Sequence, residues 1–493
     1  MERAEATLVA ANRHESNNYR RLLCQLLLEC ATSTDADTEL STLNTYSIVA
    51  RSRCDKIVMN GRYVRAMKCR TSIRCALCTA VWIAVASHAA AAGSDKPEAN
   101  AVIVHYADMA QAIYEDARTG ARDLRESIDA LIAHPTSETL NAAKASWKQA
   151  RILYLQSEGF RFANTVIDDW EPKVNAWPLD EGLIDYVGQA YGKQSDLNPL
   201  YTLNVLANTK LRVGAKVLVA TTIDTGLLRS LQEAEGVQTN VATGYHAIEF
   251  LLWGQNLAGL AGGQGSRPAT DYNVAACTHG NCARRAAYLK AAADLLVSDL
   301  EEMAADWDEK GKARAELMAK GSDGGLAEIL TGLGSLSFGE MAGERMKLGL
   351  MLHDPEEQQD CFSNNTHNSH YYDEIGIAGI WRGRYVGTDG KVIEGTSLRD
   401  YVLAVDPAAA QRLDTALENA LNTIKKMKDE ADSGHMAYSQ MISAGNANGN
   451  KLVSDSMDAL VMQTHAIENI AAVLHVKVSS GKSDHNPGGT GLH

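Results

Sequence analysis

Proline and aromatic residues are scarce in this sequence, and acidic residues outnumber basic ones. Only 9 of its 493 residues are proline, so long stretches are free to be helical. Aromatic side chains make up 6%, and 47 Lys and Arg against 61 Asp and Glu leave a formal net charge of −14. This acidity argues against sequence-independent nucleic-acid binding, which needs a basic surface. It does not argue against cation binding.

Several catalytic motifs are absent from the sequence. The zinc-peptidase patterns His-Glu-x-x-His and His-x-x-Glu-His do not occur, and neither does the Gly-x-Ser-x-Gly of esterases. The segment Gly481-Lys482-Ser483 lacks the preceding glycine of a phosphate-binding loop. No catalytic residue is therefore assigned.

Residues 67–92 have the features of a secretory signal. Basic residues at the start are followed by an apolar run over 75–86 and by small residues up to Ala92. The run is too short for a finished membrane span, and no other stretch approaches the ~18 apolar residues that a span needs. A buried core helix is the alternative interpretation. We expect export to the periplasm, where association with the outer membrane is an open alternative.

A signal at this position makes residues 1–66 an unusual leader. They either precede the true initiator, Met67, or form a poorly structured extension. Six of the nine cysteines lie within the first 78 residues. Of the others, Cys277 and Cys282 are close enough in sequence to close a disulfide ring in an oxidising compartment. Cys361 is left over, and a free buried thiol is its simplest interpretation.

Apolar residues recur at helical spacing through most of residues 100–480, which predicts an all-α protein. One exception is 385–393, where two short β-prone runs flank Asp389-Gly390 and predict a small β-hairpin insertion. Short loops between helices predict antiparallel bundles. Besides the helix that begins near residue 103, we expect helices over about 138–165, 200–219, 240–253, 282–319, 324–352, 408–429 and 453–475.

One tetrapeptide occurs twice, and it organises the prediction of domains. The segment His246-Ala247-Ile248-Glu249 is identical to His465-Ala466-Ile467-Glu468, and each copy lies late in its half of the chain. The repeat predicts two related helical bundles that arose by internal duplication. We expect the signal at 67–92 to be followed by a first bundle at 93–255, a linker at 256–281, a second bundle at 282–480 and a disordered tail at 481–493.

Histidine and glutamate three positions apart share a helix face and can converge on one cation. An imidazole with a carboxylate suits iron, zinc or copper better than calcium or magnesium. The spacing alone is weak evidence, because His353 and Glu356 match it too. We expect a metal site at the first copy, His246 and Glu249. The second copy, His465 and Glu468, lacks the preceding glycine, and we favour a plain hydrogen-bonded contact there.

The context of the first copy is more specific than its spacing. Residues 244–254, Gly-Tyr-His-Ala-Ile-Glu-Phe-Leu-Leu-Trp-Gly, resemble the Gly-x-His-x-x-Glu motif of the imelysin family, also called the insulin-cleaving metalloproteinase or iron-regulated protein A family. Residues 177–186 resemble the acidic motif of its first half. Residues 338–346 and 360–373 are similar to the second half of its iron-regulated branch. The resemblance spans nearly all of 95–475.

This resemblance implies two related bundles with a site between them. Asp180 and Glu181 with Glu340 and Arg345 are the implied neighbours of the metal pair. Simpler roles exist: Asp180 could cap a helix, and Arg345 could form an ordinary ion pair. A polar surface loop is equally consistent with the weaker candidates, which are Asn364, His367, His370 and Asp373.

We therefore expect a periplasmic, iron-regulated protein that binds a divalent or ferric metal ion and takes part in iron uptake or handling. Iron is the first choice of metal, and zinc or copper comes next. One alternative is a metallopeptidase that uses the Gly-x-His-x-x-Glu motif, and another is a peptide- or glycan-binding cleft without metal. The expected partners are a metal ion or small ligand and a periplasmic or outer-membrane protein, but no nucleic acid. Oligomeric state stays open.

Overall fold

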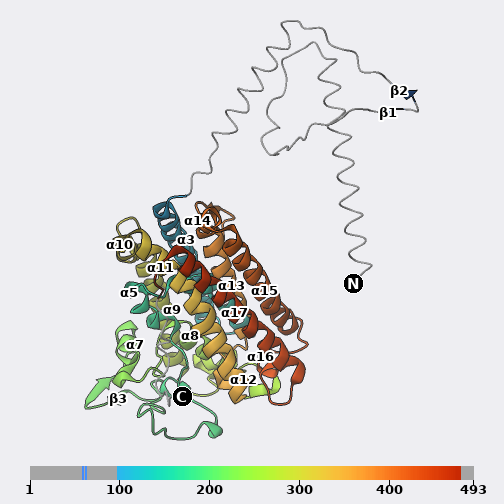
Figure 1. Cartoon of the computed structure of the whole chain (residues 1–493). Helices are drawn as coiled ribbons and strands as arrows, with labels where there is room; N and C mark the ends of the chain where they lie inside the picture. The colour runs from blue at the N-terminus through green and yellow to red at the C-terminus, as the bar shows by residue number, and fades with distance from the viewer. Residues whose placement is uncertain (1–57, 60–61, 64–96, 479–493) are drawn as a thin grey trace. The chain divides into compact units, whose positions relative to one another are not determined.

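A computed structural model describes residues 58–59, 62–63 and 97–478 (Figure 1). The chain divides into two compact units, Met1–Ala91 and Ala92–His493. In the first unit the described residues are the short strands β1 (Val58–Met59) and β2 (Arg62–Tyr63), which pair antiparallel. The predicted signal at 67–92 and the predicted tail at 481–493 lie outside the described residues, as does most of the segment 1–66.

Long helices build the second unit. The 35-residue helix α3 (Ala99–Ala133) packs against α4 (Ser137–Leu155) and α9 (Cys282–Asp306). Helices α15 (Pro407–Asp432) and α17 (Ala447–Leu474) lie side by side, as Figure 1 also shows. The prediction of an all-α protein is confirmed, apart from small hairpins.

The remaining helices of the second unit connect and cover these long ones. Helix α13 packs between the two groups, against α4 on one side and α15 on the other. The bounds are α5 (Thr165–Asp168), α6 (Pro172–Asn175), α7 (Thr225–Leu231), α8 (Gly244–Trp253), α10 (Lys312–Ala319), α11 (Gly321–Gly334), α12 (Gly349–Leu352), α13 (Thr366–Arg382), α14 (Leu398–Val405) and α16 (Tyr438–Met441).

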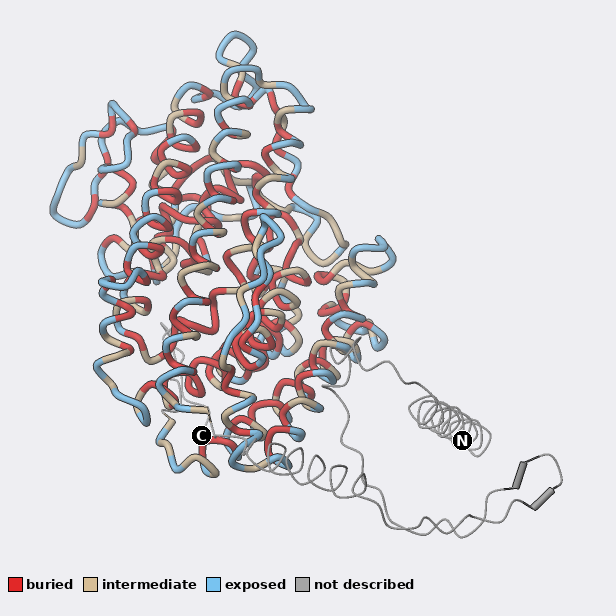
Figure 2. Tube along the Cα trace, turned by 90° about the horizontal axis from the view of Figure 1, so that it is seen from above, coloured by how far each residue is buried: buried red, intermediate tan, exposed pale blue. Residues whose placement is uncertain are grey.

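The helices form where apolar spacing and capping agree. In α3 the buried positions Val102, Tyr106, Met109 and Ile113 recur every three or four residues, so one face of the helix enters the core. The α15 N-terminus is capped by Asp406, whose side chain accepts from two backbone N–H groups. Figure 2 shows the result: buried residues line the inner sides of the helices, and exposed ones lie outside.

Two hairpins interrupt the helical unit. The predicted one is confirmed, as β5 (Arg384–Val386) pairs antiparallel with β6 (Val392–Glu394). The helix expected at 200–219 is wrong over its whole length, because residues 200–209 form turns and β3 (Lys210–Val213) pairs with β4 (Lys216–Val219) in a hairpin. Alternating lysine or arginine with valine and leucine favours a strand, and such a short apolar run has no reliable helical period.

A π-helix, η8 (Ser335–Leu348), continues α11 without a break. Its i→i+5 hydrogen bonds bring residues five apart onto the same side of the helix. Glu340 and Arg345 are such a pair, and both are buried. This pitch therefore aims a carboxylate and a guanidinium into the interior together.

Helices assigned to both predicted bundles lie in one compact unit, in which α3 packs along α9. The internal duplication and the divisions at residues 255 and 282 stay predictions. No helix within the described part of the chain is both long and apolar enough to cross a membrane.

Close backbone contact between α11 and η1 (Glu158–Phe160) gives a stability prediction. A Cβ at Gly332 would collide with the carbonyl oxygen of Gly159, so we expect Gly332→Ala to lower the free energy of unfolding by about 1–3 kcal/mol. Gly339→Ala is the matched control, since nothing lies within 4 Å of its added Cβ. Urea unfolding followed by circular dichroism measures both, and equal stabilities would contradict the prediction.

Candidate functional site

Helix α8 carries the Gly-x-His-x-x-Glu motif, and every one of its residues is buried. The motif begins at Gly244, whose φ of 80° is a left-handed conformation that favours glycine. A Cβ there would also collide with the carbonyl of Val174 at the end of α6. Glycine therefore lets α8 start directly against α6, which fixes where the next turn places His246.

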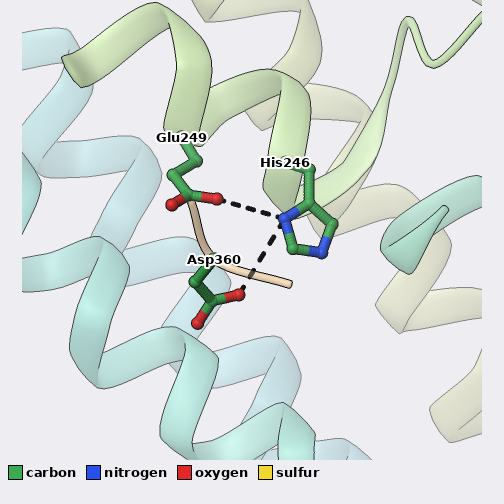
Figure 3. A group of neighbouring side chains, drawn as sticks. All are labelled: His246, Glu249 and Asp360. Carbon is green, nitrogen blue, oxygen red and sulfur yellow. Dashed lines mark hydrogen bonds and ion pairs between the residues drawn. The ribbon is translucent and has the colours of Figure 1, made fainter. Parts of the chain in front are cut away.

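Three side chains meet at one point in the interior (Figure 3). The Nδ1 atom of His246 lies 3.1 Å from Oε2 of Glu249 and 3.9 Å from Oδ1 of Asp360. One ligand atom from each residue lies within 4.8 Å of the others. Their side chains are 1%, 0% and 0% exposed in that order. We refer to His246, Glu249 and Asp360 as the triad.

The segment after Asp360 folds around the carboxylates of the triad. Ser363 donates both its backbone N–H and its hydroxyl to Oε1 of Glu249, at 2.8 and 2.7 Å. Asp360 accepts through Oδ2 from Ser369 at 2.5 Å and from Asn365 at 3.1 Å. Each carboxylate is thus held by donors from the start of α13 and the loop before it.

Arg151 of α4 closes the triad from the other side. Its Nε lies 3.3 Å from Oδ1 of Asp360, and its Nη2 lies 3.4 Å from Nε2 of His246. A guanidinium can only donate, so Nε2 of the imidazole is the acceptor and the proton sits on Nδ1. The Nδ1 proton is then donated to Glu249.

Burial sets the charge state of the triad. Burial, and after it the Arg151 guanidinium, lowers the pKa of His246 to about 3, so the imidazole is neutral near pH 7. Burial and the nearby Asp360 raise the pKa of Glu249 well above its ordinary value. Burial alone would raise the pKa of Asp360, but Arg151 and His246 hold it below the ordinary value.

A second buried network adjoins the first. Arg345 of η8 donates to Glu158 at 2.9 Å, to Glu340 at 3.1 Å and to Asp373 at 2.8 Å. Asn175 links the two networks, because its Oδ1 accepts from Arg151 at 2.5 Å and its Nδ2 donates to Glu158 at 3.3 Å. The predicted neighbours Glu340 and Arg345 thus belong to the second network, which Glu158, Asn175 and Arg151 connect to the triad.

Other predicted residues lie elsewhere. The Asp180 carboxylate accepts hydrogen bonds from the side chains of Asn198 and Thr239. Glu181 accepts from Gln255 at 3.2 Å, and neither acid belongs to the triad.

The weaker candidates are spread along α13 and α17. His370 is fully buried against Tyr438 with no hydrogen-bond partner on either ring nitrogen, and burial and Arg345 lower its pKa to about 3. Asn364 and His367 line a polar cavity next to the triad. His465 and Glu468 are 63% and 61% exposed and pair with each other at 3.2 Å on the surface.

Sequence reasoning did not single out Asp360, Arg151 and Ser363. Ser363 lies 114 residues from its partner Glu249, and Arg151 lies 95 residues from His246, so no local spacing connects them. Asp360 opens the 360–373 segment, whose resemblance was the one available signal. An arginine on a predicted amphipathic helix gives no sign that it is completely buried.

Cys277 and Cys282 form a disulfide with a Cα–Cα distance of 5.9 Å. Cys361, directly after the triad's Asp360, is a free buried thiol. Burial, and next the Glu356 carboxylate, raise the pKa of this thiol.

The fold and site define an all-α protein with a buried histidine–carboxylate centre on a glycine-initiated helix. The imelysin family model matches residues 110–467, and the chain belongs to this family. None of the curated proteins matches the sequence.

Two solved structures are similar in fold. An iron-regulated protein A precursor from Parabacteroides distasonis ATCC 8503 has a TM-score of 0.54 and 13% identity, over 78% of this chain and 97% of that one. An imelysin-like protein from Psychrobacter arcticum 273-4 has a TM-score of 0.52 and 16% identity, over 78% of this chain and 98% of that one.

Glu181 gives a prediction on pH. Burial and the nearby Glu356 raise its pKa to about 8, so the folded state favours the protonated acid. The contribution of Glu181 to the free energy of unfolding is fully present below the ordinary pKa of about 4.3. It is lost as the pH rises through about 8. We expect Glu181→Gln to stabilise the protein relative to wild type by about 1–3 kcal/mol at pH 9 and much less at pH 5.

Urea unfolding at the two pH values measures this difference. Glu418→Gln, at an exposed position on α15, is the control and is expected to change stability equally at both pH values. A Glu181→Gln effect that does not grow with pH would contradict the prediction.

Proposed function

We propose that this imelysin-family protein binds a metal ion at His246, Glu249 and Asp360 and takes part in iron handling in the periplasm. The observation that carries the proposal is the convergence of one imidazole nitrogen and two carboxylates within 4.8 Å of one another. This mixed nitrogen and oxygen donor set suits iron, zinc or copper. Iron is favoured because a structural neighbour is an iron-regulated protein A precursor.

Ligation would require a change of protonation. Each nitrogen and oxygen of the triad has a protein partner, and the proton on Nδ1 of His246 lies between the imidazole and Glu249. His246 would hold a metal ion through Nδ1 as the other neutral tautomer, with the proton moved from Nδ1 to Nε2. Ser363, Ser369 and Asn365 would keep both carboxylates oriented, as supporting donors commonly do in metal sites.

A metallopeptidase using the same residues has less support. Its substrate backbone would have to reach side chains that are at most 1% exposed. Cleavage also needs an activated water, and both Glu249 oxygens are already engaged by Ser363 and His246. The triad is therefore better suited to holding an ion than to turning over a polypeptide.

The repeated tetrapeptide supplies a matched test of metal binding. Isothermal titration of the metal-stripped protein with ferrous, ferric-chelate and zinc solutions is expected to show one site that His246→Ala weakens ~10-fold or more. His465→Ala changes the exposed copy of the same tetrapeptide and should leave the affinity unchanged. The proposal would be contradicted if His246→Ala left the metal affinity unchanged, or if none of these metals bound to the wild-type protein.

Proton release gives an independent readout. Burial and Asp360 raise the pKa of Glu249, so we expect metal binding to displace a proton from this carboxyl group and the affinity to rise with pH. Titrations in two buffers of different ionisation enthalpy measure the protons released. Zero release at pH 7 would contradict the displacement of a proton from Glu249 by the metal ion.

A further inference from the structure

A polar cavity of about 410 Å³ lies beside the triad. This volume is within the usual range for small-molecule sites. Its walls come from α4, from the loop 262–264, from the segment that begins α13, and from the C-terminal end of α15. The lining residues that matter here are Lys148, Gln264, Ser363, Asn364, His367 and Asp432.

Ser363 is shared between the cavity and the triad. It lines the cavity and also donates its N–H and hydroxyl to Glu249. One residue therefore separates a molecule in the cavity from the buried carboxylate.

Two polar atoms in the cavity wall have no partner. Oδ1 of Asn364 and Nδ1 of His367 are both buried and form no hydrogen bond. The other ring nitrogen of His367, Nε2, lies 3.0 Å from Oδ1 of Asp432 and 3.0 Å from Nδ2 of Asn368. Oδ1 of Asn364 is an acceptor, and a ligand hydroxyl group would satisfy it. A hydroxyl both donates and accepts, so it would also satisfy Nδ1 of His367 in either tautomer.

A cation completes the wall. Within residues 97–478, neither Lys148 in the cavity nor Lys144 one turn earlier on α4 forms an ion pair, although the chain carries a net charge of −14. Lys144 instead lies 5.2 Å from the centre of the Trp253 ring. Trp253 in turn donates to Gln264, another lining residue. Two unneutralised cations at this edge favour a ligand with negative charge.

We propose that this cavity binds a small hydroxycarboxylate. Its carboxylate pairs with Lys148, and its hydroxyl donates to Oδ1 of Asn364. A neutral sugar would leave the lysine unpaired, and a carboxylate without hydroxyls would leave Oδ1 of Asn364 unsatisfied. Binding requires no metal ion in the triad, so the test is separate from that of metal binding.

Calorimetric titration of metal-stripped protein with citrate tests the proposal. Tricarballylate, which has the same three carboxylates without the hydroxyl, is expected to bind at least ~10-fold more weakly. Lys148→Gln should weaken citrate ~10-fold or more, whereas Lys148→Arg should keep most of the affinity. Lys216→Gln, on the distant-in-sequence strand β4, is the control for lost charge and should have no effect.

A second variant isolates the acceptor. Asn364 has a φ of 52°, which glycine adopts without strain, so Asn364→Gly removes the side chain and keeps the backbone. We expect it to weaken citrate ~3-fold or more and to leave tricarballylate unchanged.

Three results would overturn the proposal: no citrate binding, equal binding of tricarballylate, or affinity that Lys148→Gln does not change. Tighter binding of phosphate, glucose or aspartate than of citrate would overturn the assigned ligand class. All citrate titrations use metal-stripped protein with the triad unchanged, so a failure of the metal proposal would not be mistaken for a failure of this one.

Discussion

The guanidinium of Arg151 is the group on which the centre of this structure depends. It is completely buried, and an unpaired charge at such depth would be very costly. Its donors reach Asp360, His246 and Asn175, which come from the loop before α13, from α8 and from α6. The rings of Tyr154 and Tyr245 lie 5.7 and 5.4 Å from its central carbon and add cation–π contact. Four segments are thereby held around one charge.

The same charge explains why the triad can exist. Two carboxylates within reach of one imidazole would repel each other in a low-dielectric interior, and Arg151 lowers the pKa of one of them, Asp360. Glu249 is left as the acid whose pKa is raised. One ionised and one proton-sharing carboxylate beside a neutral imidazole form an arrangement in which a cation could take the place of a proton.

Sequence patterns anticipated the features that depend on neighbours along the chain. Apolar periodicity predicted helices α3 and α15, and turn residues predicted the β5–β6 hairpin. The i,i+3 spacing predicted the contact between His246 and Glu249. The β3–β4 hairpin was missed because a short apolar run has no decisive period. Asp360 and Arg151 were missed because their contacts are set by packing of distant segments, which no spacing encodes.

The two copies of His-Ala-Ile-Glu show how far context decides the role of a motif. In both, the histidine Nδ1 lies close to the glutamate, at 3.1 and 3.2 Å, so the local geometry is nearly the same. Gly244 lets the first copy begin a helix pressed against α6, whereas Gln463 occupies the same place in the second copy, within the long helix α17. Gln463 turns inward to Ser337 and Glu374, and the histidine two residues later faces outward. The two copies therefore share their local geometry and differ in burial, and burial is what separates a candidate metal centre from a surface contact.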